Sequence, residues 1–131
     1  AKLGIQLEIR ATDFNQYQDK TLRGRHQIFW GGWLADYPDA ENFLFLLYGP
    51  NGKTKHDGEN TANYANPEFD RLFARMKNMD NTPERLQIVR QMNRILHQDA
   101  PWDFGLHPKS YTLGHRWLKN RKPHDVGNNI L

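Results

Sequence analysis

The sequence predicts an α/β fold in which a strand, a helix and a second strand form a parallel βαβ unit, followed by helices and a return strand. Apolar and polar residues alternate over residues 3–9, and apolar residues recur at helical spacing in two later segments. The chain has 131 residues, 37% of them hydrophobic and 12% aromatic, which is enough to bury a core. This composition excludes an intrinsically disordered chain.

The first three elements follow from local patterns. Four apolar residues on one face predict a strand with one polar face: Leu3, Ile5, Leu7 and Ile9. Asp13 is the expected N-cap of a helix over residues 14–23, with Gln16 in the capping-box position and Gly24 at the end. Residues 26–33 are short, apolar and aromatic and end at two glycines, which predicts the second strand.

Three further helices are expected. Asp39 is placed to cap a largely buried helix over residues 40–48, and residues 50–65 lack periodicity and read as a surface loop. Asn66 before Pro67 and Thr82 before Pro83 each predict a helix start. The expected core residues are Phe69, Leu72, Phe73 and Met76 in one helix, and Leu86, Val89, Met92, Ile95 and Leu96 in the other.

The end of the chain predicts extended structure. Pro101 ends the last helix, and apolar residues between 102 and 113 predict one or two strands interrupted by Pro108. The chain begins without Met or a signal-like stretch and ends on an apolar pair, so we expect it to be a piece of a longer protein.

Several function classes are excluded or weakened. No apolar run approaches the length of a membrane helix. There is no Cys, no glycine-rich phosphate loop, no nucleophile elbow and no His-Glu-x-x-His motif, and the spacing of the six His residues is not that of a metal site. We therefore predict a binding protein that is not an enzyme and needs no cofactor or metal.

Two carboxylates and two indoles are the candidate binding groups. Asp36 would lie at the carboxyl end of a parallel strand, where open α/β sheets bind ligands, and it either pairs with a ligand cation or forms a turn. Asp39 is better explained as a helix cap than as a catalytic acid or base. Trp30 and Trp33 point to opposite faces of a strand, so only one can face a cleft.

A basic segment near the end suggests a second function. Residues 115–122 place basic side chains around Trp117, as nucleic-acid sites do, although a solvated terminal segment has the same composition. The formal net charge is only +3. A small nucleic-acid-binding or anion-binding domain is therefore the alternative hypothesis.

The stretch GWLADYPDAENF at residues 32–43 resembles the signature of family 5 extracellular solute-binding proteins, the peptide and nickel receptors of ABC importers. Further stretches resemble that family in the same order along the chain: NYANPEFD at residues 63–70, PER at 83–85, DAPW at 99–102, and KN to PH at 119–124.

The resemblance implies a two-lobed type II periplasmic-binding fold, of which this chain is a C-terminal fragment. Residues 1–105 would be part of the second ligand-binding lobe, and residues 106–131 a return segment toward the hinge and the first lobe. It also implies that Asp36, with Trp33 and Gly32, binds the ligand, with Asp36 accepting the α-ammonium group of a peptide. Sugars and metal chelates are the other ligand classes of the family.

The expected partners are a small solute or peptide and the membrane permease subunits that receive it. The resemblance places the protein in the periplasm or otherwise outside the cytoplasmic membrane, either free or lipid-anchored. A fragment of a lobe has lost strand partners, so we also expect the chain to self-associate through open edges.

Overall fold

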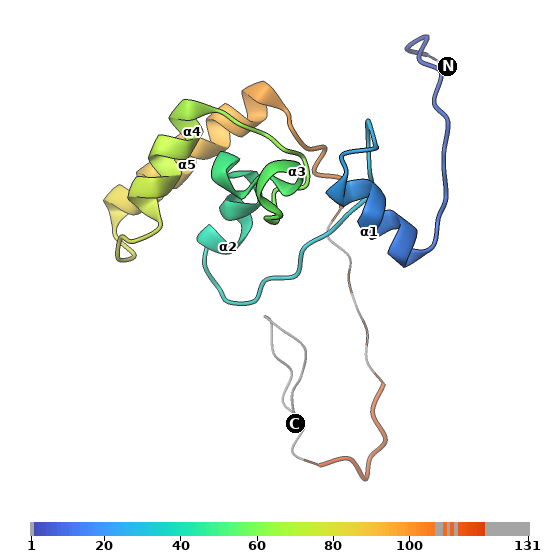
Figure 1. The fold of residues 1–131 in the computed structure, drawn as a ribbon. Coiled ribbons are helices and arrows are strands. Elements are labelled where there is room, and N and C mark those ends of the chain that lie inside the picture. Colours follow the sequence, from blue (N-terminus) through green and yellow to red (C-terminus); the bar gives the residue numbers. More distant parts are fainter. Residues whose placement is uncertain (1, 107–108, 110, 112, 120–131) are drawn as a thin grey trace.

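The computed structural model describes residues 2–106, 109, 111 and 113–119. Helices α4 (Pro67–Met76) and α5 (Pro83–Asp99) lie side by side (Figure 1). Both begin as predicted: the Asn66 side chain accepts the backbone N–H groups of residues 68 and 69, and Thr82 accepts that of residue 85. A proline in the first turn has no N–H to satisfy, so the two helix starts are set by local chemistry.

The core lies between these helices and the short helix α2 (Glu41–Leu44) with the 3-10 turn η1 (Phe45–Leu47). Its buried members are Leu44, Leu47, Phe69, Leu72, Phe73, Met76, Ile88, Met92 and Leu96. The predicted stripe of α4 is confirmed. The stripe of α5 is confirmed for Met92 and Leu96, which are buried, and for Val89 and Ile95, which are partly buried against the core. It is wrong at the start of the helix, where Ile88 is buried and Leu86 is 50% exposed.

The predicted helix over residues 40–48 is shorter and broken. The α-helix ends at Leu44, the 3-10 turn follows, and Tyr48 is extended. Ala40, and not Asp39, is the N-cap, although Asp39 Oδ1 does accept the backbone N–H of Glu41 at 2.7 Å. The expected burial of this segment is confirmed for Leu44, Leu46 and Leu47.

The expected surface loop at 50–65 is in fact partly ordered around a buried asparagine. It contains the 3-10 turn η2 (Gly49–Asn51) and the helix α3 (Lys53–His56). Asn60 is fully buried: its Nδ2 donates to the carbonyl groups of Tyr48 and Tyr64, and its Oδ1 accepts the N–H of Tyr64. Such tertiary hydrogen bonds leave no periodic signal in a sequence.

Helix α1 (Phe14–Leu22) confirms the first predicted helix. Asp13 Oδ1 accepts the N–H of Gln16 at 2.9 Å, and Gly24 takes a φ of +61°, which glycine adopts without strain. Helix α1 contacts α3 and lies on the side of the molecule away from α4 and α5 (Figure 1).

The predicted strands at residues 3–9 and 26–33 are not formed within the described part of the chain. The one β-interaction recorded there is an isolated parallel bridge between Gly52 and Asn60. Residues 2–12 run away from the helices, and the apolar side chains at 3, 5, 7 and 9 are 66–85% exposed (Figure 1). A strand needs a hydrogen-bonded neighbour, and no described segment pairs with this one.

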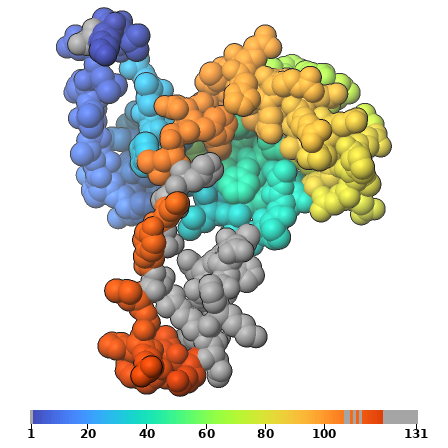
Figure 2. All heavy atoms as spheres, turned by 180° about the vertical axis from the view of Figure 1, so that it is seen from behind, coloured from blue at the N-terminus to red at the C-terminus, as the bar shows by residue number. Residues whose placement is uncertain are grey.

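The end of the chain is described only in part. Residues 102–106 form no strand. The rest of the predicted strand region up to residue 113, and the family-like stretch at 119–124, include positions outside the described residues. Residues 113–119 lie away from the helices in both views (Figures 1 and 2). None of the helices in the described residues combines the length and the apolar character needed to cross a lipid bilayer.

Candidate functional site

A buried amide holds the segment that carries the predicted binding residues. Asn42, in the first turn of α2, is 2% exposed. Its Oδ1 accepts the indole Nε1–H of Trp33 at 3.1 Å and the backbone N–H of Asp36 at 2.9 Å. Its Nδ2 donates to Asp36 Oδ2 at 3.2 Å. Two of the three predicted binding residues are thus brought together around one side chain.

Of the two predicted indoles, Trp33 is the one that packs. It is half-buried, and its ring meets that of Phe45 edge to face, with the centroids 5.5 Å apart. Trp30 is 78% exposed. Trp33 therefore has one edge fixed by the protein and part of its ring surface exposed.

Asp36 is exposed, with one carboxylate oxygen held by Asn42. Its other oxygen, Oδ1, accepts no hydrogen bond from the described residues, so it is available to a charge-assisted donor such as an ammonium or guanidinium group. Gly32 is exposed, and a Cβ built there would meet nothing within 4 Å. Packing alone does not require glycine at that position.

Asp39 lies close to this segment but has a different partner. The buried Arg85 donates from Nη2 to Asp39 Oδ1 at 2.7 Å and from Nη1 to Oδ2 at 2.9 Å. Hydrogen bonds from Arg85 hold the pKa of the Asp39 carboxyl below its usual value, and the N–H of Glu41 acts in the same direction. A carboxylate kept ionised in this way is a poor proton donor, which agrees with a structural role.

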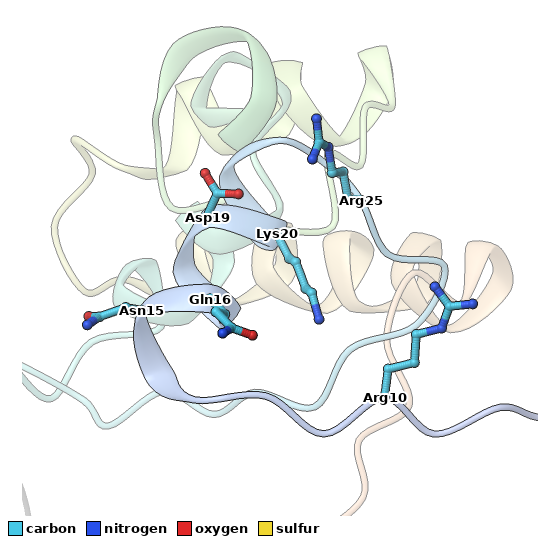
Figure 3. Close-up of a pocket in the computed structure, with 6 residues that line it drawn as sticks. All are labelled: Arg10, Asn15, Gln16, Asp19, Lys20 and Arg25. Carbon is cyan, nitrogen blue, oxygen red and sulfur yellow. The ribbon is translucent and has the colours of Figure 1, made fainter.

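An open pocket lies elsewhere, at α1. Its lining residues are Arg10, Asn15, Gln16, Asp19, Lys20 and Arg25. Figure 3 shows the cationic groups of Arg10, Lys20 and Arg25 on one side and Asp19 on the other. A second pocket contains Asp39 and Arg85. Neither of these two pockets is lined by Gly32, Trp33 or Asp36.

The basic segment is described only up to residue 119. His115 stacks on Trp117 with the ring centroids 4.9 Å apart and the planes 11° apart, and both side chains are exposed. Arg116 and Lys119 are exposed too, while residues 120–122 lie outside the described residues. Among the residues that the structure describes, no three His, Asp or Glu side chains gather as a metal site would require.

Sequence reasoning missed Asn42 and Arg85. Asn42 lies only six residues after Asp36. An asparagine in a short apolar helix does not, by its spacing, indicate which side chains it contacts. Arg85 is 46 residues from Asp39, and only the tertiary fold brings the two together.

The comparisons with known proteins agree with one another. Residues 1–55, which include Gly32, Trp33, Asp36 and Asn42, match the family model described as "Bacterial extracellular solute-binding proteins, family 5 Middle". No solved structure matches the chain.

Curated relatives extend the match over most of the chain. Di/tripeptide-binding protein 4 of Pseudomonas aeruginosa is 28% identical over 131 residues, covering 98% of this chain and 24% of that protein. The oligopeptide-binding protein OppA of Bacillus subtilis is 30% identical over 76% of this chain and 17% of its own length. Heme-binding protein A of Haemophilus influenzae is 29% identical over 78% of this chain and 18% of its own length. The chain thus spans about a fifth of the length of the curated relatives that it matches.

Proposed function

We propose that this chain, which belongs to family 5 of the bacterial extracellular solute-binding proteins, supplies part of the binding site of a peptide receptor, with Asp36 accepting the peptide's α-ammonium group. Trp33 and the exposed backbone at Gly32 contact the peptide beside that group. Every peptide with a free amino end has this ammonium group, so its recognition tolerates different side chains.

The observation that carries this proposal is the state of the Asp36 carboxylate. Asn42 fixes one oxygen at 3.2 Å, and the exposed Oδ1 can receive a charged donor. A carboxylate that merely closed a turn would direct its oxygens to N–H groups of its own loop. Here the buried amide of Asn42 accepts the loop N–H of Asp36 and donates to Oδ2, which leaves Oδ1 for another partner.

The proposal includes the fold of the complete receptor, its location and its partner. The receptor has the type II periplasmic-binding fold of its family, residues 1–105 belong to its second lobe, and residues 106–131 return toward the hinge. Residues 3–9 and 26–33 pair there as neighbouring strands, which the exposed apolar residues at 3, 5, 7 and 9 support. The receptor works outside the cytoplasmic membrane, free or lipid-anchored, and delivers its ligand to an ABC permease by closure of the lobes without chemical turnover.

The alternative of a nucleic-acid-binding domain is not favoured. The matched relatives are named for binding di/tripeptides, oligopeptides or heme, and the match includes the segment of Asp36. A nucleic-acid site would also lose affinity steeply between low and moderate salt, whereas an ammonium contact enclosed by closure of the lobes would lose far less.

The test compares trialanine with N-acetyl-trialanine, using the full-length protein and its Asp36→Asn variant. Acetylation removes the ammonium charge, and Asn keeps the size of Asp without its charge. We expect the unmodified protein to bind trialanine much more tightly than the acetylated peptide, and Asp36→Asn to lose that preference. Equal binding of both peptides by the unmodified protein would contradict the role of Asp36. Binding of heme, a sugar or a metal chelate in place of either peptide would contradict the peptide class.

A further inference from the structure

The Asn42 side chain makes three hydrogen bonds to two of the residues that the proposed site uses. Its Oδ1 accepts two hydrogen bonds, which fills both lone pairs, and its Nδ2 donates to Asp36. These three hydrogen bonds tie Asn42 to Trp33 and Asp36. A buried amide is costly unless it is bonded in this way, and a leucine would fill an apolar core position without that requirement.

We infer that Asn42 is a positioning residue of the binding site, which fixes the direction of the Asp36 carboxylate and the edge of Trp33 before a ligand arrives. This inference rests on the proposed function of Asp36. Asn42 itself does not touch the ligand. Its Nδ2 holds Asp36 Oδ2, so that Oδ1 faces the incoming ammonium group, and its Oδ1 ties the indole and the loop backbone to α2.

The chain offers a matched control for this inference. Asn60 is also a fully buried asparagine whose side chain makes three hydrogen bonds, but its partners are the backbone groups of Tyr48 and Tyr64. Loss of Asn60 removes a similar number of buried hydrogen bonds without releasing Asp36 or Trp33. A variant at Asn60 therefore shows the effect of a general loss of stability, separate from a loss of orientation of Asp36 and Trp33.

The experiment is a double-mutant cycle on the full-length protein, with trialanine affinity measured by calorimetry. The four proteins are the unmodified protein, Asn42→Leu, Asp36→Asn and the double variant. Each is titrated with trialanine to saturation. We expect Asn42→Leu to weaken binding about tenfold, as for one hydrogen bond to a charged group, and to have less than about a twofold effect once Asp36 is replaced. Asn60→Leu should lower the melting temperature and leave the preference for trialanine over N-acetyl-trialanine unchanged.

A second variant covers the case in which Asn42→Leu does not fold. Asn42→Asp has the same shape and keeps the acceptor for Trp33 and for the Asp36 N–H, but it places an oxygen where Nδ2 donated to Asp36. We expect the like charges to turn Asp36 away and weaken trialanine binding about tenfold, with no such loss when Asp36 is replaced by Asn.

The outcomes separate the two hypotheses. If Asp36→Asn leaves the preference for trialanine intact, both the proposed function and this inference are overturned. If Asp36→Asn abolishes the preference while the Asn42 variants bind normally, the proposed function stands and the inference is wrong. Equal losses from an Asn42 variant in both backgrounds would likewise assign Asn42 a structural role only.

Discussion

The guanidinium group of Arg85 and the carboxylate of Asp39 form a two-pronged ion pair at 2.7 and 2.9 Å, across 46 residues of chain. The Arg85 side chain is 7% exposed and that of Asp39 is 24% exposed. Arg85 Nε also donates to the carbonyl of Met76, at the end of α4. One side chain of α5 therefore fastens both the segment before α2 and the end of α4.

Replacing Arg85 by Met should destabilise the protein. Met preserves the apolar stem but removes the Arg85 hydrogen bonds to the Asp39 carboxylate and to the Met76 carbonyl. We expect a loss of about 2 kcal/mol in the free energy of unfolding, below the usual cost of breaking a fully buried pair because Asp39 is partly exposed. Urea denaturation measures it. The exposed pair of Arg71 with Glu68 is the control, and Arg71→Met should leave the urea midpoint unchanged.

The same pair predicts a loss of stability in acid. The pKa of Asp39 is lower in the folded protein than in the unfolded chain, chiefly because Arg85 donates to it. Its contribution is therefore fully present above the ordinary carboxyl pKa of about 4 and is lost as the pH falls through the lowered folded value. Urea midpoints between pH 6 and pH 2.5 should fall less steeply for Arg85→Met than for the unmodified protein. Parallel profiles would contradict the pairing.

The exposure of Leu86 predicts that two alanine substitutions on α5 differ in their effect on stability. Met92 is fully buried and Leu86 is 50% exposed. We expect Met92→Ala to lower the free energy of unfolding by about 3 kcal/mol, since it removes buried atoms and leaves a cavity. Leu86→Ala should cost less than about 0.5 kcal/mol. Thermal and urea denaturation check both values, and a loss for Leu86→Ala as large as that for Met92→Ala would place Leu86 in the core, as the sequence predicted.

The exposed apolar residues of segment 3–9 predict self-association of the 131-residue chain by itself. Ile5 is 66% exposed and Leu7 is 68% exposed, on a segment with the alternation of a strand. Sedimentation velocity should show larger species as the concentration rises, and the double variant Ile5→Lys, Leu7→Lys should abolish them. A monomer at every concentration would contradict this prediction.

The helix starts were predictable because they depend on neighbouring residues. Asp13, Asn66 and Thr82 each bond to N–H groups two or three residues ahead, so their sequence context contains the whole interaction. The face of α5 was predicted correctly except near its start, where apolar residues occur on more than one side of the helix. Leu86 lies two residues from Ile88, about 200° around the helix, and only contact with α4 decides which one is buried.

The candidate site was also predictable only where its residues are neighbours in the sequence. Gly32, Trp33 and Asp36 are adjacent in sequence, and the resemblance of their motif located them. Asn42 and Arg85 were not predicted, because their importance comes from burial and from partners that the fold supplies. Helix α3 was missed for the same reason, since Asn60 orders that region through contacts with Tyr48 and Tyr64.

The hydrogen bond from the Asp36 backbone N–H to Asn42 makes one amide proton a reporter of loop opening. Asp36 is exposed, yet its amide proton is directed at a buried oxygen, so it can exchange with deuterium only when the loop leaves α2. The exchange rate of that single amide therefore reports how often the loop opens in the absence of ligand. It measures how much of the ordering that the proposed binding needs is already present in the protein without a ligand.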